Sequence, residues 1–590
     1  MNRISYYICL IMLASSCQQS GSSGDIWTPT AFLNLPDENL GTALPASEGR
    51  NIAEPQEDRG LLYDTESWTA GAERVVDFTK SLQDRWNKIF RGKEEPEEEL
   101  LPEDFNTYYH SLNLLPTPDF PYGVASGDPL PDGIILWTMV KPEDECESHQ
   151  VFWELSERPD FKETTRIGVE WASPAHHYRI KLDLRELSPE TTYYYRFRLA
   201  NGAESAIGRT RTSPMPNSAS PLRFAIVSCN AFEWGHFNGF GRISERDDLN
   251  AVLHLGDYIY EYASGEYGDL SIGRLHEPRH ELITEEDYNQ RYAQYRSDLQ
   301  LAAAHAAHPF ICIWDDHEVA NDSYTEGAEN HDSETEGDYL LRMTSAKQIY
   351  YDWMPVRESN SGHLYRSFTW GSVADLHMLD ERLAGRTVQA SSFSPEDLAD
   401  PNRQMLGEQQ FEWLIGQLEQ GESRWQLIGN QVLFARLDLS NALPQHATNV
   451  DAWDGYRHEK YRLEDYLNSI DDPKVLFLTG DTHCSWYFDI RHRNDGKLLA
   501  RELATPSLSS ANFDELGGDD GIGNWAAKHT IYRDNPDLIY TDLTHHGYII
   551  LEVDPQKVRA EYHYSKTILE VDRNEYRPVT FEINHATDGQ

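Results

Sequence analysis

Short apolar runs alternate with amphipathic helical patterns from about residue 222 onward. Runs such as "LRFAIVSCN", "LNAVLHLGD", "PFICIWDDHE" and "ADLHMLDER" are apolar enough for buried parallel strands, and "RWQLIGNQVLF" and "KVLFLTGDTHCSW" repeat the pattern. The segments "EDYNQRYAQYRSDLQLAAAHAAH" and "GEQQFEWLIGQLEQ" have helical spacing, and "YIILEVD" and "RAEYHYS" add late strands. The pattern predicts a layered α/β domain over residues 222–575.

The residues that precede this domain have a different pattern of hydrophobic and polar positions. Over residues 118–215, short runs of alternating hydrophobicity such as "GIILWTMV", "HQVFWELS" and "TTYYYRFRLA" are separated by turn residues. This spacing predicts a small β-sandwich, and "LSPETTYYYRFRL" is similar to a fibronectin type III strand. We expect this sandwich to be a scaffold without chemistry of its own.

The N-terminus has the pattern of an export signal. Arg3 precedes the apolar run "YYICLIMLA", which is too short to span a membrane. The run ends in "LASSC", so residues 1–17 resemble the signal peptide of a bacterial lipoprotein with Cys17 as the lipidated residue. We expect a cell-envelope lipoprotein, periplasmic or on the cell surface; ordinary secretion is the alternative. Residues 18–117 are acidic and are expected to form a tether, with one helical pattern between Val75 and Phe90.

Length and charge narrow the class of protein. A chain of 590 residues is too long for one core, and 39% hydrophobic residues suit a folded protein. The net charge of -47 argues against binding nucleic acids through general electrostatics. It is compatible with a small phosphate-binding site whose metal ions reverse the local field. Oligomeric state is not indicated.

Six of the predicted strands end in polar residues. The strand ends are "SCN", "GDYIYE", "WDDHEVAND", "LDER", "GNQ" and "GDTHCSW". Since ligands bind at the carboxyl ends of strands in open α/β sheets, we expect these residues along a single sheet edge. No "GxSxG" nucleophile motif occurs in the domain, and no Walker loop occurs in the chain. The repeated Gly-Asp and Asp-x-His patterns therefore favour a metal site.

These motifs carry a family resemblance. In this order after "FPYGVASGDP", the elements "SC", "GDYIYE", "WDDHE", "LDxR", "WDGY" and "GDxHxxW" resemble the PhoD-like alkaline phosphatase and phosphodiesterase family of metallophosphoesterases over residues 118–570. The resemblance implies a metallophosphoesterase-type α/β/β/α sandwich preceded by the fibronectin-III-like β-sandwich. It also implies hydrolysis of phosphate esters by a metal-activated water at a dinuclear centre of Fe3+ and one or more Ca2+.

The matching positions imply the metal ligands. Iron would be held by Cys229, Asp257, Tyr260 and His483, with Asp257 bridging to calcium, and the calcium side by Asp316, Asn321 and Asp481. Coordination chemistry agrees, because oxygen ligands suit Ca2+ whereas thiolate and imidazole suit a transition metal. The alternatives are a buried core thiol for Cys229 and a packed aromatic ring for Tyr260.

Four further residues are candidates for handling the substrate. His317 is expected to bond a phosphoryl oxygen or to protonate the leaving oxygen, and Arg382 to clamp phosphate, with a salt bridge to a carboxylate as the alternative for Arg382. Asn430 and Gln431 are expected to contact phosphate or to support the ligands. His305, His308, His545 and His546 have no assigned role, since histidines on helix faces and loops are more often structural or on the surface. The alternative for the whole protein is a calcium-binding surface lipoprotein without catalysis.

Overall fold

The computed structural model describes residues 114–584 except 143–146, 360–361, 442–448, 471–473, 514 and 516–520, and not the side chains of 521–527. The predicted signal peptide with Cys17, the helical pattern of 75–90 and Cys146 lie outside the described residues. Within the described part, no helix is both long and apolar enough to cross a bilayer. The remaining described cysteines, Cys229, Cys312 and Cys484, are free and buried.

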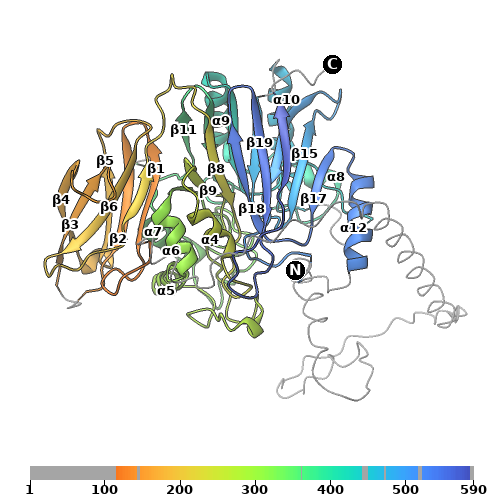
Figure 1. The fold of residues 1–590 in the computed structure, drawn as a ribbon. Coiled ribbons are helices and arrows are strands. Elements are labelled where there is room, and N and C mark those ends of the chain that lie inside the picture. Colours follow the sequence, from red (N-terminus) through yellow and green to blue (C-terminus); the bar gives the residue numbers. More distant parts are fainter. Residues whose placement is uncertain are drawn as a thin grey trace, which may run out of the picture. The chain divides into compact units, whose positions relative to one another are not determined.

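Two large β-sheets form the centre of the molecule (Figure 1). The first has nine strands in the order β20 (Val579–Asn584), β19 (Lys557–Tyr564), β18 (Gly547–Val553), β8 (Leu222–Val227), β9 (Ala251–His254), β10 (Pro309–Cys312), β1 (Val124–Leu130), β2 (Gly133–Met139) and β5 (Arg179–Leu184). The second has seven strands in the order β11 (Arg366–Trp370), β12 (Ala374–Met378), β13 (Trp425–Asn430), β14 (Val475–Thr479), β16 (Leu498–Ala504), β15 (Ser485–Arg491) and β17 (Leu538–Asp542).

The six polar strand ends are divided between these two sheets. Strands β8, β9 and β10 run parallel in the first sheet, and β12, β13 and β14 run parallel in the second. The expectation of a single sheet edge was therefore wrong. Apolar runs alone do not show which strands pair, because every buried parallel strand has the same pattern.

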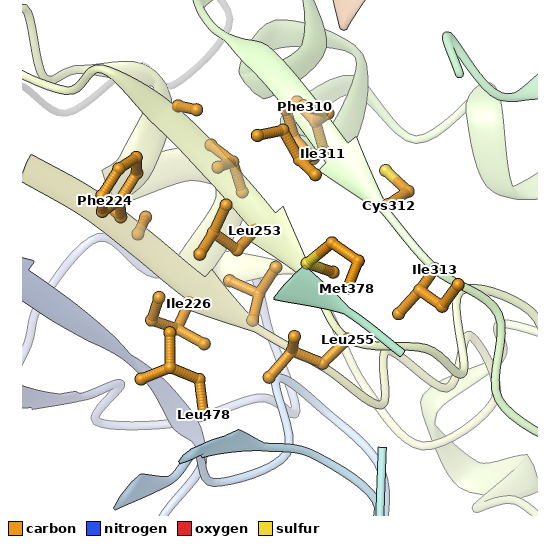
Figure 2. Packing of buried hydrophobic residues seen from close by; sticks show 14 of the residues in the cluster. Phe224, Ile226, Leu253, Leu255, Phe310, Ile311, Cys312, Ile313, Met378 and Leu478 are labelled. Carbon is orange, nitrogen blue, oxygen red and sulfur yellow. The ribbon is translucent and has the colours of Figure 1, made fainter. Parts of the chain in front are cut away.

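The two sheets pack face to face through a shared apolar core. Figure 2 shows Phe224, Ile226 and Leu253 of the first sheet with Met378 and Leu478 of the second in one buried cluster. Cys312 lies in the same core, as expected for a small apolar residue. The close packing of this interface fixes the carboxyl ends of both sheets relative to each other.

Helices cover the outer faces and complete four layers. On the first sheet, the Phe240 ring of α4 contacts the rings of His254 and Phe310. On the second sheet, Leu414 of α9 and Leu463 of α10 share a buried cluster with Ile428 of β13. Within the described residues, the α-helices are α4 (Asn238–Ser244), α5 (Glu285–Arg296), α6 (Leu299–Ala307), α7 (Tyr339–Trp353), α8 (Pro395–Leu398), α9 (Gly407–Gln420), α10 (Arg457–Ser469) and α12 (Gly521–Asp534). This is the predicted α/β/β/α arrangement.

The long helical pattern before β10 forms two helices. Helix α5 begins with a capping box of Thr284 and Asp287, and α6 begins at the N-cap Asp298, whose side chain accepts hydrogen bonds from the next turn. A capping Asp inside a continuous periodic pattern is the signal for this break.

The N-terminal strands are shared between two sheets. Strands β4 (Arg166–Ala172), β3 (His149–Ser156), β6 (Thr192–Leu199) and β7 (Gly208–Arg211) form a separate four-stranded sheet. Strands β1, β2 and β5 instead continue the nine-stranded sheet, where β1 pairs in parallel with β10. Tyr193, Tyr195 and Phe197 of β6 are buried, as the alternating pattern of that run indicates.

Candidate metal centre

Four of the predicted ligands occupy left-handed turns at strand ends. The backbone φ is 58° at Cys229 after β8 and 56° at Asp257 after β9. It is 58° at both Asp481 and His483, which follow β14. Few non-glycine residues adopt this conformation, and it costs about 1–3 kcal/mol when the surroundings impose it. The turns reverse the chain at the sheet edges and bring the ligand side chains together.

Gly256 permits a close approach between the turn after β9 and the loop after β10. Its φ is 113°, and a Cβ atom at this position would lie 2.7 Å from the backbone nitrogen of Asp315. Any side chain here would push the ends of β9 and β10 apart. The glycine of "LGDYIYE" therefore lets Asp257 and the "WDDHE" loop approach each other.

The first group of ligand atoms lies between the two sheets. Ligand atoms of Cys229, Asp257 and His483 are within 4.8 Å of one another. The Tyr260 hydroxyl lies 3.0 Å from Oδ2 of Asp257 and 3.4 Å from Nε2 of His483. Nδ1 of His483 bonds the Ala511 carbonyl at 2.7 Å, so Nε2 is the nitrogen that faces the group. All four predicted iron ligands thus meet at one point.

Burial makes this group a poor site for unpaired anions. Burial, followed by neighbouring carboxylates, raises the pKa of the Cys229 thiol and of the Tyr260 phenol well above their usual values. Burial lowers the pKa of His483 to about 4, so this imidazole is neutral near pH 7. A neutral imidazole with a thiol and a phenol that ionise only beside positive charge matches the donor set of a trivalent transition metal.

A second group shares Asp257 with the first. Ligand atoms of Asp257, Asp316 and His317 lie within 4.8 Å of one another. Oδ1 of Asp257 and Oδ1 of Asp316 are buried and accept no hydrogen bond, whereas Oδ2 of Asp316 accepts one from the Asp322 amide at 2.6 Å. Buried carboxylate oxygens without donors are rare in folded proteins. Their presence fits a cation beside Asp257 and Asp316.

His317 is held by a buried carboxylate. Nδ1 of His317 lies 2.7 Å from Oε2 of Glu261, and the imidazole packs on the Tyr260 ring at a centroid distance of 4.4 Å. Burial alone lowers the pKa of His317, but the charges of Asp316, Glu261 and Asp257 outweigh it and raise the pKa well above the usual value. These charges therefore favour the protonated imidazole.

Arg382 is enclosed by carboxylates. Its side chain is fully buried, with Nη1 2.8 Å from Asp451 and Nε bonded to Asp315. Nη2 makes no hydrogen bond and lies 3.6 Å from Asp316 and 3.8 Å from Asp481. The guanidinium thus forms the salt bridges given above as the alternative to a phosphate clamp.

The other predicted residues lie at the margin of the two groups. The backbone amide of Asn321 donates to Glu261 at 2.7 Å, and its side-chain oxygen accepts from Tyr262 at 3.1 Å. Asn430 and Gln431 are fully buried. The Asn430 amide bonds Thr479 at 3.1 Å and Trp453 at 3.2 Å, and the Gln431 amide bonds the backbone of residues 379 and 381 at 2.9 Å. These contacts hold the loops and leave no exposed amide for phosphate.

Three carboxylates at the site were not assigned from the sequence. Glu261 holds His317, and Glu318 accepts from the backbone amides of Asp257 at 3.2 Å and Asp315 at 2.7 Å. Asp451 bonds Arg382. Glu261 and Glu318 lie inside "GDYIYE" and "WDDHE", and Asp451 shortly precedes "WDGY", so motif membership was the available signal.

Comparisons with family models, with curated proteins and with solved structures all find PhoD-like phosphatases. A family model described as PhoD-like phosphatase matches residues 224–562, and one described as its N-terminal domain matches residues 112–214. Alkaline phosphatase D of Bacillus subtilis (strain 168) is 33% identical over 463 residues, 75% of this chain and 77% of that protein. The solved structure of PhoD has a TM-score of 0.71 at 31% identity, covering 79% of this chain and 90% of that chain. A purple acid phosphatase from yellow lupin (Lupinus luteus) seeds shares the fold, with a TM-score of 0.51 at 16% identity over 80% of this chain and 74% of that one.

Proposed function

The chain belongs to the PhoD-like phosphatase family and is therefore a hydrolase of phosphoric esters. From this premise we propose that the protein is exported and that it uses a dinuclear metal centre. The supporting observation is the sharing of Asp257 by the two ligand groups, one with sulfur and nitrogen donors and one rich in oxygen. Shared carboxylates join the cations of two-metal hydrolases. The substrates are phosphomonoesters, phosphodiesters or both.

The donor chemistry supports a different cation for each group. Cys229, Tyr260 and His483 with Asp257 would hold Fe3+, because a thiolate and a phenolate suit a trivalent transition metal. Asp257 and Asp316, with Asn321 and Asp481 nearby in the fold, would hold Ca2+, which prefers oxygen ligands. When bound, such cations attract phosphoryl oxygens and activate water for attack on phosphorus.

The residues of the chain supply orientation and a proton. Glu261 fixes the His317 ring through Nδ1, which leaves Nε2 for a phosphoryl or leaving-group oxygen. The negative charges of Asp316, Glu261 and Asp257 raise the pKa of His317, and Glu261, which is not one of the proposed ligands, favours a proton on the imidazole, as a general acid requires. The positive charge of Arg382 offsets the negative charges of Asp316 and Asp481, so that these side chains can lie close together in the folded protein.

Turnover measured on metal-quantified protein tests this function. Release of nitrophenol from mono- and diester substrates is expected, with loss on calcium chelation and with iron found by metal analysis. Asp257→Asn is expected to lower activity by at least about 100-fold, since several kcal/mol of transition-state stabilisation depend on the cations, and to lower metal content. Asp375→Asn is the matched control, because Asp375 is buried on β12 and bonds Gln426 at 3.2 Å. Metal-loaded wild-type protein without turnover would refute the catalytic proposal and favour a calcium-binding protein.

Export and anchoring are proposed from the N-terminal pattern alone. We propose that Cys17 becomes the lipidated N-terminus of a cell-envelope protein in bacteria. Cys17→Ala is expected to move the protein from the membrane fraction to the soluble fraction without changing its turnover number. Equal membrane association of both proteins would refute the anchor.

A further inference from the structure

One loop contacts the ligand-bearing segments of both sheets. Residues 507–511, "SLSSA", follow β16 and are almost completely buried. The Leu508 amide donates to the Ser228 carbonyl at 3.0 Å, and the Ser510 amide donates to the Cys229 carbonyl at 3.1 Å. Both acceptors lie at the end of β8 in the nine-stranded sheet. The loop therefore holds the turn that presents the Cys229 thiol.

The same loop holds His483 on the other sheet. The Ser507 amide donates to the His483 carbonyl at 3.0 Å, and the Ala511 carbonyl accepts from His483 Nδ1 at 2.7 Å. A third connection runs from the Ser510 hydroxyl to the Tyr267 hydroxyl at 2.8 Å, and the Tyr267 ring stacks on Tyr260. Loop 507–511 thus contacts two of the four proposed iron ligands directly, Cys229 and His483, and reaches Tyr260 through Tyr267.

A buried chain of side chains fixes this loop. The Ser507 hydroxyl donates to the Ser510 carbonyl at 2.6 Å and lies 2.9 Å from Nδ1 of His546. Nε2 of His546 lies 3.0 Å from a Glu515 oxygen, and the other oxygen of Glu515 accepts from the Asn512 amide at 3.0 Å. The Ser507 hydroxyl and the Glu515 carboxylate thus hold the His546 ring at both of its nitrogens. His546 is only 6% exposed.

We propose that His546 is a positioning residue for the metal centre and that it acts through loop 507–511. It touches neither a proposed ligand nor the space between the two groups. By holding Ser507, it fixes the loop that sets Cys229 and His483 at their mutual distance and orients the His483 ring. Partners that orient metal ligands typically contribute about 10–100-fold to metal affinity or activity. This inference rests on the proposed metal centre.

Iron retention in the full chain tests the proposal. His546→Gln is expected to release iron to a chelator about 10–100-fold faster than wild type and to change the position or intensity of the visible band from Tyr260 ligation. We expect kcat to fall while KM changes little, because substrate contacts are not altered. Ser507→Ala removes the link between His546 and the loop together with the Ser507–Ser510 hydrogen bond inside the loop, so it is expected to shift all three readouts in the same direction.

His545→Gln is the matched control. His545 is the adjacent histidine, its side chain is 40% exposed, and it pairs with Asp542 at 2.9 Å rather than with the loop. It is expected to retain wild-type iron release, band and turnover. If His546→Gln fails to fold by circular dichroism, Ser507→Ala decides the question. Folded variants with wild-type iron release and band would overturn the positioning role alone, whereas wild-type protein that binds no iron would overturn the proposed centre and this inference together.

Discussion

Replacing Glu261 with glutamine removes one buried negative charge beside His317 and keeps the size of the side chain. In the structure one carboxylate oxygen lies 2.7 Å from His317 Nδ1, and the other accepts from the Asn321 amide at 2.7 Å. Hydrogen bonds that involve a charge contribute about 1.5–3 kcal/mol and neutral ones about 0.5–1.5, so the substitution costs about 1–2 kcal/mol. If His317 donates the proton to the leaving oxygen, this cost corresponds to about a 5–30-fold loss in kcat.

The loss is expected to depend on the leaving group and on pH. Nitrophenolate leaves with little help from an acid, whereas an alkoxide needs a proton, so alkyl phosphates are expected to show the full loss and nitrophenyl phosphate a smaller one. Activity that requires protonated His317 is lost as the pH rises through its raised pKa. Because Glu261 is one of the charges that raise this pKa, Glu261→Gln is expected to move the alkaline limb of the kcat profile to lower pH.

Glu281→Gln is the control for this experiment. The Asn330 amide lies 3.4 Å from Glu261 and 3.1 Å from Glu281, but Glu281 pairs with Arg342 at 2.8 Å instead of with His317. We expect this variant to keep the wild-type leaving-group dependence and alkaline limb. Equal losses on alkyl and nitrophenyl esters in Glu261→Gln, with the limb in its wild-type place, would refute His317 as the proton donor.

Three further substitutions test the centre and its surroundings. Tyr260→Phe is expected to fold and to lose the visible absorption of iron-loaded protein; an unchanged spectrum would remove Tyr260 from the ligands. Arg382→Met leaves Asp315 buried without its cation and leaves Asp451 with Arg386 alone. It is expected to lower the free energy of unfolding by about 3–5 kcal/mol, measured by urea denaturation, where a loss below about 1 kcal/mol would contradict the paired geometry. Burial lowers the pKa of His308 to about 3, so its contribution to stability is present above about pH 6.5 and is lost as the pH falls. We expect the free energy of unfolding to fall by about 2 kcal/mol by pH 5 in the wild type and by less in His308→Gln. Equal acid sensitivity of the two proteins would contradict this expectation.

The strands and helices follow closely from local patterns. The run "GEQQFEWLIGQLEQ" coincides with α9, and "LRFAIVSCN" contains β8 followed by Cys229. Such agreement is expected, because burial imposes a period of 2 on half-buried strands and 3.6 on helices. The division of the strands between two sheets is a long-range property. It depends on which strands pair, and apolar runs of similar composition do not encode that visibly.

The candidate ligands could be named because they lie in motifs at strand ends. Their supporting partners were harder to predict, since Glu261 and Glu318 act through distances that only the folded chain defines. His546 is more than 60 positions away from His483 in the sequence, and no motif connects them. The pairing of Arg382 with Asp451 crosses 69 positions in the same way. A residue that holds a metal ligand through a hydrogen bond belongs to no sequence motif that would mark this role.

The left-handed turns explain why so many hydrogen bonds hold the ligand-bearing segments. At about 1–3 kcal/mol for each such turn, the conformations of Cys229, Asp257, Asp481 and His483 oppose folding unless other contacts offset them. Glu318 holds the turn of Asp257, and loop 507–511 holds those of Cys229 and His483. Among the described residues, the Asp481 backbone makes no hydrogen bond to Glu318 or to loop 507–511, and its side chain lies 3.8 Å from Arg382 instead. The ligands of the proposed iron site are thus preorganised by hydrogen bonds, whereas the side with Asp481 depends on charge. We therefore expect removal of calcium to disturb the surroundings of Asp481 more than the proposed iron site.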